Sequence, residues 1–375
     1  MDIYQEALEA HHNLRGKLQI KSKVPLVSPK DLSIYYSPGV GAVADLLGKH
    51  PEKTPEYTSV NNTVAIISDG SAVLGLGNIG PYGALPVMEG KAILFKEFAD
   101  IDAFPMVLNT QDPDEIIKTI INIAPSFGGI NLEDIASPNC FYIENELKKR
   151  LDMPIMHDDQ HGTAIVVLAG LINSCLVTNR KLSDCKIVIS GSGAAGIAIA
   201  KLIYKYAKPR IIAVDSKGII HKNRENLNTE KKMLLEMTDG FEGSLSDAIV
   251  EADIFIGVSK PKILTESMIK AMANNPIIFA LANPEPEILP ELALKAGAAI
   301  VATGRSDYPN QVNNVLAFPG VFRGALDTRT KIDDAHKIAA AEAIARVVRV
   351  PRPDCVIPSP FDDRVVRVVS ESFSH

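Results

Sequence analysis

Short apolar runs alternate with longer amphipathic runs along most of the chain. Apolar runs of about four to eight residues indicate buried strands, and apolar positions that recur every three or four residues indicate helices. In the first half, this pattern predicts strands at 63–68, 103–108, 127–132 and 153–156, and helices at 85–98, 114–124 and 141–151. Strands that alternate with helices are typical of βαβ units and a mostly parallel sheet.

The second half begins with a predicted helix at 163–177 and continues with a more regular series of strands. We expect these strands at 186–190, 211–215, 253–258, 277–282 and 298–303. The chain is therefore predicted to have an α/β fold of two domains with mostly parallel sheets, the second a Rossmann-type doubly wound nucleotide-binding domain. A boundary near residue 160 would give a substrate and metal domain at 1–160 and a nucleotide-binding domain with a helical C-terminal tail at 161–375. The pattern does not say against which domain this tail packs.

Composition narrows the class of protein. The chain has 375 residues, 46% of them hydrophobic, and a net charge of −6 without a Lys/Arg-rich run, so nucleic acid is not an expected partner. No signal peptide is recognisable, and the longest apolar stretch, 163–176, falls short of the roughly 20 residues that cross a bilayer. The four scattered cysteines form no CxxC pair, which favours reduced thiols over a zinc or iron–sulfur site. We expect a cytoplasmic protein that does not bind membranes.

A glycine-rich segment after the strand at 186–190 indicates a dinucleotide site. In this fingerprint the first glycine allows a tight turn, the second lets the backbone approach a pyrophosphate, and the third lets helix and strand pack closely. Asp215 ends the next predicted strand, where a carboxylate can accept hydrogen bonds from a ribose. The residues of the expected cofactor loop are Gly191, Gly193, Ala194, Ala195 and Gly196.

A second segment, 75–80, matches the same glycine pattern in a different context. No strand runs directly into its first glycine, and Pro81 and Pro86 follow it. We interpret this loop as backbone of the substrate domain rather than as a nucleotide site.

Two acidic pairs, Glu133-Asp134 and Asp158-Asp159, each follow a short predicted strand. The carboxyl ends of parallel strands share one edge of a sheet, so the pairs should converge there. Clustered carboxylates suit Mg²⁺ or Mn²⁺, although two solvated acidic loops would show the same pattern. His157 and His161 flank the second pair at a spacing that could suggest zinc. We favour a strand-end position for His157 and a helix-start position for His161, with hydrogen-bonding roles for both.

Lys91 has apolar neighbours three and four residues away on both sides within its predicted helix. Such a lysine either extends to solvent or is held desolvated, and desolvation lowers its pKa toward that of a useful base. Tyr36 stands before a Pro-Gly turn and has no local argument for catalysis. Asn283 and Asn314 follow predicted strands, at the edge where ligands bind, but turn chemistry also explains them.

Together these segments resemble the malic enzyme family, in particular its short bacterial and archaeal forms, over nearly the whole chain. The segments that carry the resemblance are YYSPGV (35–40), SDGSAVLGLGNIGPYGALPVMEGKAILFK (68–96), GGINLEDI (128–135), HDDQHGTA (157–164), GSGAAG (191–196), ALANPEPE (280–287) and NQVNNVLAFPGV (310–321).

The resemblance implies oxidative decarboxylation of malate to pyruvate and CO₂ with NAD or NADP, and it also implies decarboxylation of oxaloacetate. It implies Tyr36 as general acid, Lys91 as general base and Asp158 in the proton network around Lys91. Glu133, Asp134 and Asp159 would bind Mg²⁺ or Mn²⁺, and Asn283 and Asn314 would hold the substrate, Asn283 also bordering the cofactor. A homodimer or higher homo-oligomer is expected from the family.

One position departs from the pattern of animal-type relatives. Those proteins carry a carboxylate-binding arginine beside the LGLG motif, where this chain has Ala72. Recognition of the substrate carboxylate must therefore differ, through backbone amides of the 71–80 loop or through an amide side chain. Two rival hypotheses are a metal-independent 2-hydroxy acid dehydrogenase and a nucleotide-sensing protein without catalysis. Cofactor choice also stays open, since Asp215 opposes a 2′-phosphate whereas Lys217 and Lys222 could offset it.

Overall fold

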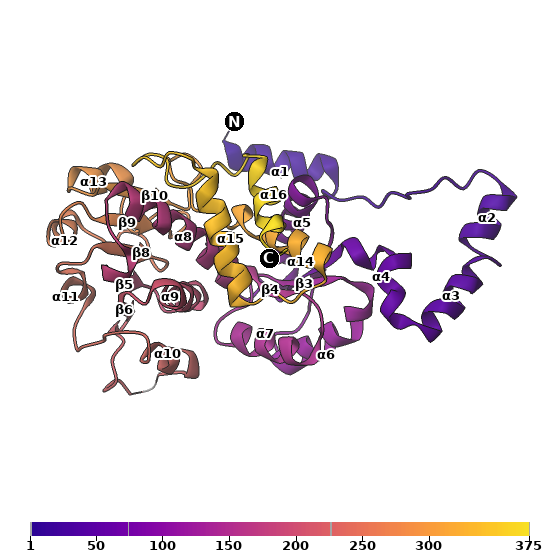
Figure 1. Ribbon diagram of the computed structural model, residues 1–375, viewed down its shortest axis with the longest axis horizontal. Helices are drawn as coiled ribbons and strands as arrows, with labels where there is room; N and C mark the ends of the chain where they lie inside the picture. Colours follow the sequence, from indigo (N-terminus) through magenta and orange to yellow (C-terminus); the bar gives the residue numbers. More distant parts are fainter. Residues whose placement is uncertain (1, 74, 226, 375) are drawn as a thin grey trace.

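The computed structural model describes residues 2–73, 75–225 and 227–374, which form two lobes and a projecting arm (Figure 1). In the first lobe, the described residues form a four-stranded parallel sheet in the order β2-β1-β3-β4. The strands are β1 (Thr63–Ser68), β2 (Asp102–Val107), β3 (Gly129–Leu132) and β4 (Ile155–His157). All four predicted strands of this half are confirmed, with ends that differ by a residue or two.

Three helices connect the strands of the first sheet. They are α5 (Gly80–Ala99), α6 (Pro113–Ile123) and α7 (Asn139–Arg150). The helix α5 packs against β1 and β2, and its residues Met88, Lys91 and Phe95 are buried. The apolar stripe that predicted this helix therefore faces the core, and it takes Lys91 inside with it.

The second lobe holds a six-stranded sheet among the described residues, in the order β10-β9-β8-β5-β6-β7. Its strands are β5 (Lys186–Ser190), β6 (Arg210–Asp215), β7 (Gly218–Ile219), β8 (Ile254–Gly257), β9 (Ile277–Ala280) and β10 (Ile300–Thr303). The pairings are parallel except that of β6 with β7. The strand order reverses between β5 and β8, which is the switch point at which a doubly wound sheet opens a ligand crevice. The predicted Rossmann-type fold is confirmed.

Helices surround this second sheet. They are α9 (Ala194–Ala207), α10 (Thr229–Leu234), α11 (Leu245–Ile249), α12 (Glu266–Lys270) and α13 (Pro290–Lys295). The helix α8 (Asp158–Val177) begins directly after β4 of the first lobe and packs against α9 of the second. It is long and apolar enough to cross a membrane by length and composition alone, yet 72% of its apolar window is buried within the fold. It therefore serves as a core helix that joins the two lobes.

The C-terminal helices return to the first lobe, which answers a question that the sequence pattern left open. They are α14 (Phe318–Thr328), α15 (Asp334–Val347) and α16 (Arg364–Glu371). The Phe95 ring on α5 lies 4.7 Å from the Phe318 ring and 5.4 Å from the Phe322 ring, measured between centroids. Arg323 donates a hydrogen bond of 2.6 Å to Asn62 beside β1. After the last strand, α14 thus packs on the first lobe.

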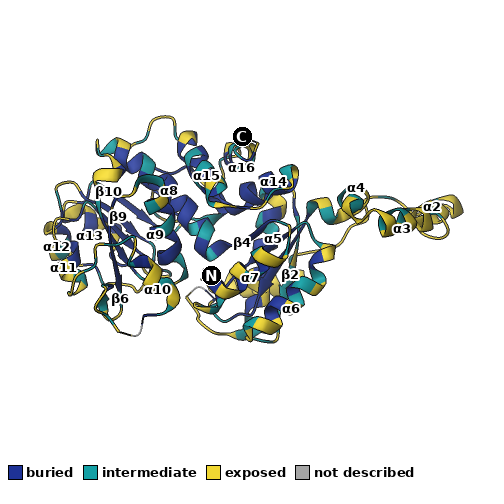
Figure 2. Cartoon of the chain, turned by 60° about the horizontal axis from the view of Figure 1, so that its bottom comes forward, coloured by how far each residue is buried: buried dark blue, intermediate teal, exposed yellow. Residues whose placement is uncertain are grey.

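The N-terminal segment begins beside the first lobe and then forms an arm that projects from it (Figures 1 and 2). Its helices are α1 (Ile3–Leu14), α2 (Pro29–Tyr35), α3 (Val40–Lys49) and α4 (Thr54–Tyr57), and none of them has a buried residue. After α1, Lys17 donates hydrogen bonds to Glu89 and to the Pro86 carbonyl on α5. Beyond that contact, α2 and α3 extend away from both lobes (Figure 2).

Candidate active site at the junction of the two lobes

Three carboxylates meet where β3 and β4 end. Glu133 and Asp134 follow β3, and Asp159 lies in the first turn of α8, directly after β4. One ligand oxygen from each of the three lies within 4.8 Å of the others. The backbone N–H of Asp134 also donates to Asp159, at 2.9 Å. Three oxygen ligands this close repel one another unless a cation lies between them, so the cluster fits a divalent cation such as Mg²⁺ or Mn²⁺.

Lys91 reaches this edge of the sheet from α5. Its Nζ donates to Glu133 Oε1 at 3.0 Å and also to Asp158 Oδ2, while the ammonium lies 3.9 Å from the centroid of the Phe318 ring. Asn314, in the loop before α14, donates from Nδ2 to the same Asp158 oxygen at 2.6 Å. The fold therefore brings Lys91, Asp158 and Asn314 together beside the carboxylate cluster.

The pKa of Lys91 moves in the direction opposite to the one expected from its apolar neighbours. Burial of the ammonium opposes its charge, but the carboxylates of Asp158 and Glu133 outweigh burial and raise the pKa of Lys91 above its ordinary value. The expectation of a lowered pKa is thus wrong for the protein without a bound cation. Burial in turn raises the pKa of Asp158 to about 8, and its carboxyl group lies within hydrogen-bond distance of Lys91 Nζ.

Several residues that support the site escaped the sequence analysis. Asn131 on β3 donates to Glu133 Oε2 at 2.8 Å. Glu144, buried on α7, accepts from the His157 backbone N–H at 3.1 Å, and its other oxygen lies 2.8 Å from His161 Nε2. Glu144 therefore holds the turn that carries Asp158 and Asp159. No local pattern marks Glu144, because its partners lie 13 and 17 positions away, whereas Asn131 contacts a residue only two positions along the chain.

The two histidines lie as predicted, with His157 closing β4 and His161 in the first turn of α8. Burial lowers the pKa of His161 to about 4, and its ring contacts Glu144 rather than the carboxylate cluster. Within the described residues, the group able to hold a metal ion contains no histidine. The geometry therefore gives a hard oxygen site and does not favour zinc.

The glycine loop at 191–196 follows β5, and its three glycines differ in what surrounds them. Gly191 has φ of +114°, which a residue with a side chain rarely adopts. A Cβ on Gly196 would lie 1.8 Å from the carbonyl oxygen of Gly191, so helix and turn can approach only without one. A Cβ on Gly193 would meet nothing within 4 Å. The space beside Gly193, at the N-terminus of α9 with Ala194 and Ala195, is thus open for a pyrophosphate.

Asp215 ends β6, as predicted, but two basic side chains already bind its carboxylate. Arg224 donates to both oxygens, at 2.9 and 3.0 Å, and Lys231 donates at 2.7 Å. Burial opposes its charge, yet these hydrogen bonds lower the pKa of Asp215 to about 2. The nearby basic residues that matter are therefore Arg224 and Lys231, whereas the sequence analysis named Lys217 and Lys222.

Asn283 lies in the loop after β9, at the carboxyl end of the second sheet. A Cβ on Gly304 would lie 2.7 Å from its amide nitrogen, so this side chain packs closely on the loop after β10. The buried carboxylate of Glu287 accepts from the Ala282 and Ser259 backbone N–H groups, each at 3.0 Å. Glu287 therefore ties the loops after β8 and β9 together and positions Asn283 at the crevice.

The 71–80 loop crosses to the second lobe, where Gly75 approaches Asn283 and Pro284. Most of its backbone N–H groups are already used within the fold. Ala72 donates to the Asp134 carbonyl, and Val73 and Gly77 form an isolated bridge with each other. Of the two alternatives for binding a substrate carboxylate, these contacts favour an amide side chain over the backbone amides of the 71–80 loop.

Tyr36 is the one candidate residue that its own chain does not bring to this site. It caps α2 on the projecting arm, and 66% of its surface is exposed. The other candidates lie either around the carboxylate cluster or along the nucleotide crevice. A single chain therefore assembles the proposed base and metal ligands without the proposed acid.

Comparison with known proteins shows which family this sequence matches. The family model described as "Malic enzyme, N-terminal domain" matches residues 15–148, and "Malic enzyme, NAD binding domain" matches residues 160–363. A bifunctional malic/malolactic enzyme from Bacillus subtilis is 54% identical over 378 residues, covering 99% of this chain and 92% of the relative. An NADP-dependent malic enzyme from Escherichia coli is 47% identical, and the match covers 97% of this chain but 51% of that protein.

Solved structures agree with these sequence matches. The NAD-dependent malic enzyme of Thermotoga maritima superposes with a TM-score of 0.95 at 50% identity, covering 98% of each chain. A malic enzyme from Pyrococcus horikoshii has a TM-score of 0.96 at 46% identity, covering 99% of this chain and 90% of the other. The similarity thus extends over both lobes and the junction between them.

Proposed function

The chain belongs to the malic enzyme family, and from that membership we propose that its junction site oxidises malate and decarboxylates it to pyruvate and CO₂ with reduction of NAD or NADP. The observation that carries the proposal is the contact of Lys91 with Glu133 and Asp158 beside a cluster of three carboxylates. A base and a cation site side by side suit the oxidation of a hydroxyl group next to a carboxylate. Oxaloacetate would be decarboxylated at the same place.

We assign Glu133, Asp134 and Asp159 as the ligands of Mg²⁺ or Mn²⁺. Their oxygens are hard donors, and they lie close enough together to share one ion. When bound, a divalent cation would polarise the hydroxyl and carboxylate oxygens of malate, and its charge would lower the pKa of Lys91. This ligand set also argues against a metal-independent dehydrogenase and against a sensor without catalysis.

Lys91 serves as the base that removes the hydroxyl proton of malate while a hydride leaves the same carbon for NAD(P). Its ammonium would first pass a proton to Asp158, to which it donates a hydrogen bond, once a bound cation has lowered the pKa of Lys91. Phe318 and Glu133 keep Nζ in place through this exchange. Asn314, fixed against Asp158, and Asn283 at the opposite edge orient the substrate carboxylates.

Both nicotinamide cofactors fit the surroundings of Asp215. Its negative charge would repel a 2′-phosphate, but Arg224 and Lys231 leave this corner of the site with a net positive charge. We propose that NAD is bound through the ribose and that NADP is accepted through Arg224. The named relatives include both NAD-dependent and NADP-dependent malic enzymes.

The acid is best supplied by a second copy of the chain. The arm carries large apolar side chains that stand in solvent in one chain, among them Ile20 at 91% exposure and Val27 at 82%. A second exposed apolar surface lies at the start of α5, the helix that bears Lys91, and includes Tyr82 at 86%. Packing the arm of one subunit on α5 of another would cover both surfaces and bring Tyr36 to Lys91. We therefore propose a homodimer in which Tyr36 protonates the methylene carbon of the enolate formed on the partner.

One assay tests the proposed function. Purified protein with malate, Mn²⁺ and NAD or NADP should reduce the nicotinamide, and pyruvate should form in equal amount. EDTA should stop the reaction. Reduction that survives EDTA would support the metal-independent dehydrogenase, and no reduction with either nucleotide would support the sensor.

We also propose a cytoplasmic location, which suits the free and mostly buried cysteines.

A further inference from the structure

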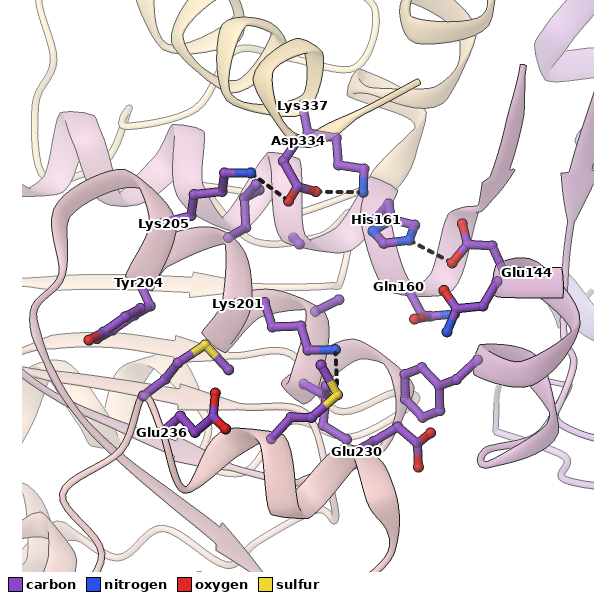
Figure 3. Close-up of a pocket in the computed structure, with 18 of the residues that line it drawn as sticks. Glu144, Gln160, His161, Lys201, Tyr204, Lys205, Glu230, Glu236, Asp334 and Lys337 are labelled. Carbon is purple, nitrogen blue, oxygen red and sulfur yellow. Dashed lines mark hydrogen bonds and ion pairs between the residues drawn. The ribbon is translucent and has the colours of Figure 1, made fainter. Parts of the chain in front are cut away.

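A cavity lies beside the N-terminal turns of α8 (Figure 3). Its volume is about 660 Å³, within the range of small-molecule sites. Its walls come from both lobes, with α7 on one side, α9 and α10 on the other, and the start of α8 between them. We call it the α9 cavity.

Lys201 on α9 is a partly buried cation without a carboxylate partner. Its Nζ points into the cavity, where its one hydrogen-bond contact is with Met233 Sδ at 4.0 Å (Figure 3). Among the described residues no carboxylate oxygen forms an ion pair with it, and Glu230, Asp334 and Glu144 favour its charge only from a longer distance. Burial lowers the pKa of Lys201. A bound anion would compensate the charge that the protein leaves unpaired.

Gln160 supplies a second polar group that the fold does not use. Its side chain lines the cavity and is 3% exposed, yet its amide nitrogen has no hydrogen-bond partner among the described residues. A buried donor in this state has lost its hydrogen bonds to water without replacement, and a ligand oxygen would supply one. Gln160 therefore points to an acceptor ligand.

The remaining charges of the cavity are largely paired. Asp334 binds Lys205 and Lys337, at 3.0 and 3.1 Å, and Glu144 binds Lys148 at 2.7 Å and His161. Glu230 lies on α10 and Glu236 follows that helix in an exposed position, and neither forms an ion pair among the described residues. Phe141, Ile197 and Met233 add apolar wall between them. The unpaired cation, the unused amide and these apolar walls thus define one recognition pattern.

We propose that the α9 cavity binds a small organic anion with an apolar body, whose negative group contacts Lys201 and Gln160. The ligand would bridge the two lobes beside Glu144, the residue that holds the turn carrying Asp158 and Asp159. No glycine of the nucleotide loop lines this cavity, whose α9 wall runs from Ile197 to Lys205.

A fluorescent probe tests this site without relying on turnover. The aromatic sulfonate 8-anilinonaphthalene-1-sulfonate should bind the enzyme saturated with Mn²⁺ and NAD, which occupies the junction site. Lys201→Met should weaken this binding by about tenfold or more, because it removes a charge-assisted contact. Met233→Trp should weaken it as well by filling the cavity, at a residue exposed enough (45%) to tolerate the change.

Lys262→Met is the matched control, since Lys262 is an exposed lysine paired with Glu285 and is not among the residues of the cavity. It should bind the probe as the unaltered enzyme does. Equal probe affinity in the unaltered enzyme, Lys201→Met and Met233→Trp would overturn the proposal. Because probe binding needs no catalysis, a failure here is distinguishable from a failure of malate oxidation.

Discussion

A buried lysine keeps its proton when carboxylates lie within hydrogen-bond reach, and Lys91 is such a residue. The apolar neighbours that bury it are visible in the sequence within one helical turn. The carboxylates that reverse its pKa shift lie 42 and 67 positions away. Sequence reasoning could therefore find the residue and its burial but not the direction of its titration.

The same reasoning at residue scale gives a test of the metal ligands. Asp159→Asn should lower turnover with malate and Mn²⁺ by about 100-fold or more, because one of three ligand charges is lost. Nucleotide affinity should stay nearly unchanged, since the glycine loop is a separate structure. Isothermal titration with Mn²⁺ and with NAD measures both. Asp152→Asn, an exposed carboxylate at 97%, is the control, and unchanged Mn²⁺ affinity in Asp159→Asn would reject the ligand assignment.

Cofactor choice also depends on single residues. Arg224→Gln should lower kcat/KM for NADP by about tenfold or more, because a phosphate loses a charge-assisted hydrogen bond. The value for NAD should fall less or rise, since Asp215 becomes free to accept from the ribose. Lys222→Gln, nearby but without a contact to Asp215, should change neither. An equal loss with both cofactors would show that Arg224 does not discriminate between them.

At the scale of helices and strands, patterns among residues close in the sequence predicted the structure most accurately. The glycine fingerprint predicted a strand, a turn and a helix that all lie where expected, because Gly191 and Gly196 allow a close turn that side chains would block and Gly193 leaves open space. The helix expected from residue 163 begins instead at Asp158, since the acidic pair and His161 belong to its first turn. The short antiparallel β7 was missed, because two residues leave no periodicity to read.

Glu144 shows how one helix positions another. Glu144→Ala should leave the His157 N–H unpaired in a buried place and loosen the first turn of α8. We expect KM for Mn²⁺ to rise by about 10–100-fold, as for other residues that orient metal ligands, with a smaller change in kcat. Glu146→Ala, on the same helix but paired with Lys149 and Arg150 near the surface, should leave KM for Mn²⁺ unchanged. If both variants behave alike, Glu144 only stabilises the fold.

At the scale of the whole molecule, two features depend on contacts between distant segments. The tail packs α14 on the first lobe through Phe318 and Phe322, which no pattern in the tail itself could indicate. The arm that carries Tyr36 leaves its apolar side chains exposed in one chain. The sequence located the candidate acid by resemblance alone, and the fold of a single chain separates it from its base. The proposed association of two chains would bring the two residues together.

A heterodimer separates a shared site from one built within a single chain. Let one subunit carry Tyr36→Phe and the other Lys91→Ala, each of which should be inactive as a homodimer because acid–base catalysis is worth about 10²–10⁴-fold. If Tyr36 serves the partner, one site of the heterodimer keeps both native residues and the other loses both. Tandem affinity purification through two tags should then recover about half of the unaltered activity.

If Tyr36 instead serves its own chain, each site of that heterodimer lacks one essential residue and no activity returns. The control pairs Lys91→Ala with Asp159→Asn, both within one lobe of the same chain, so every site stays defective whichever way the arms exchange. Recovery in the first pair but not in the second assigns Tyr36 to the partner's site. An inactive first pair, in a dimer of correct mass that binds Mn²⁺, would refute the exchange of arms, and the acid would have to reach Lys91 by a movement of the arm within one chain.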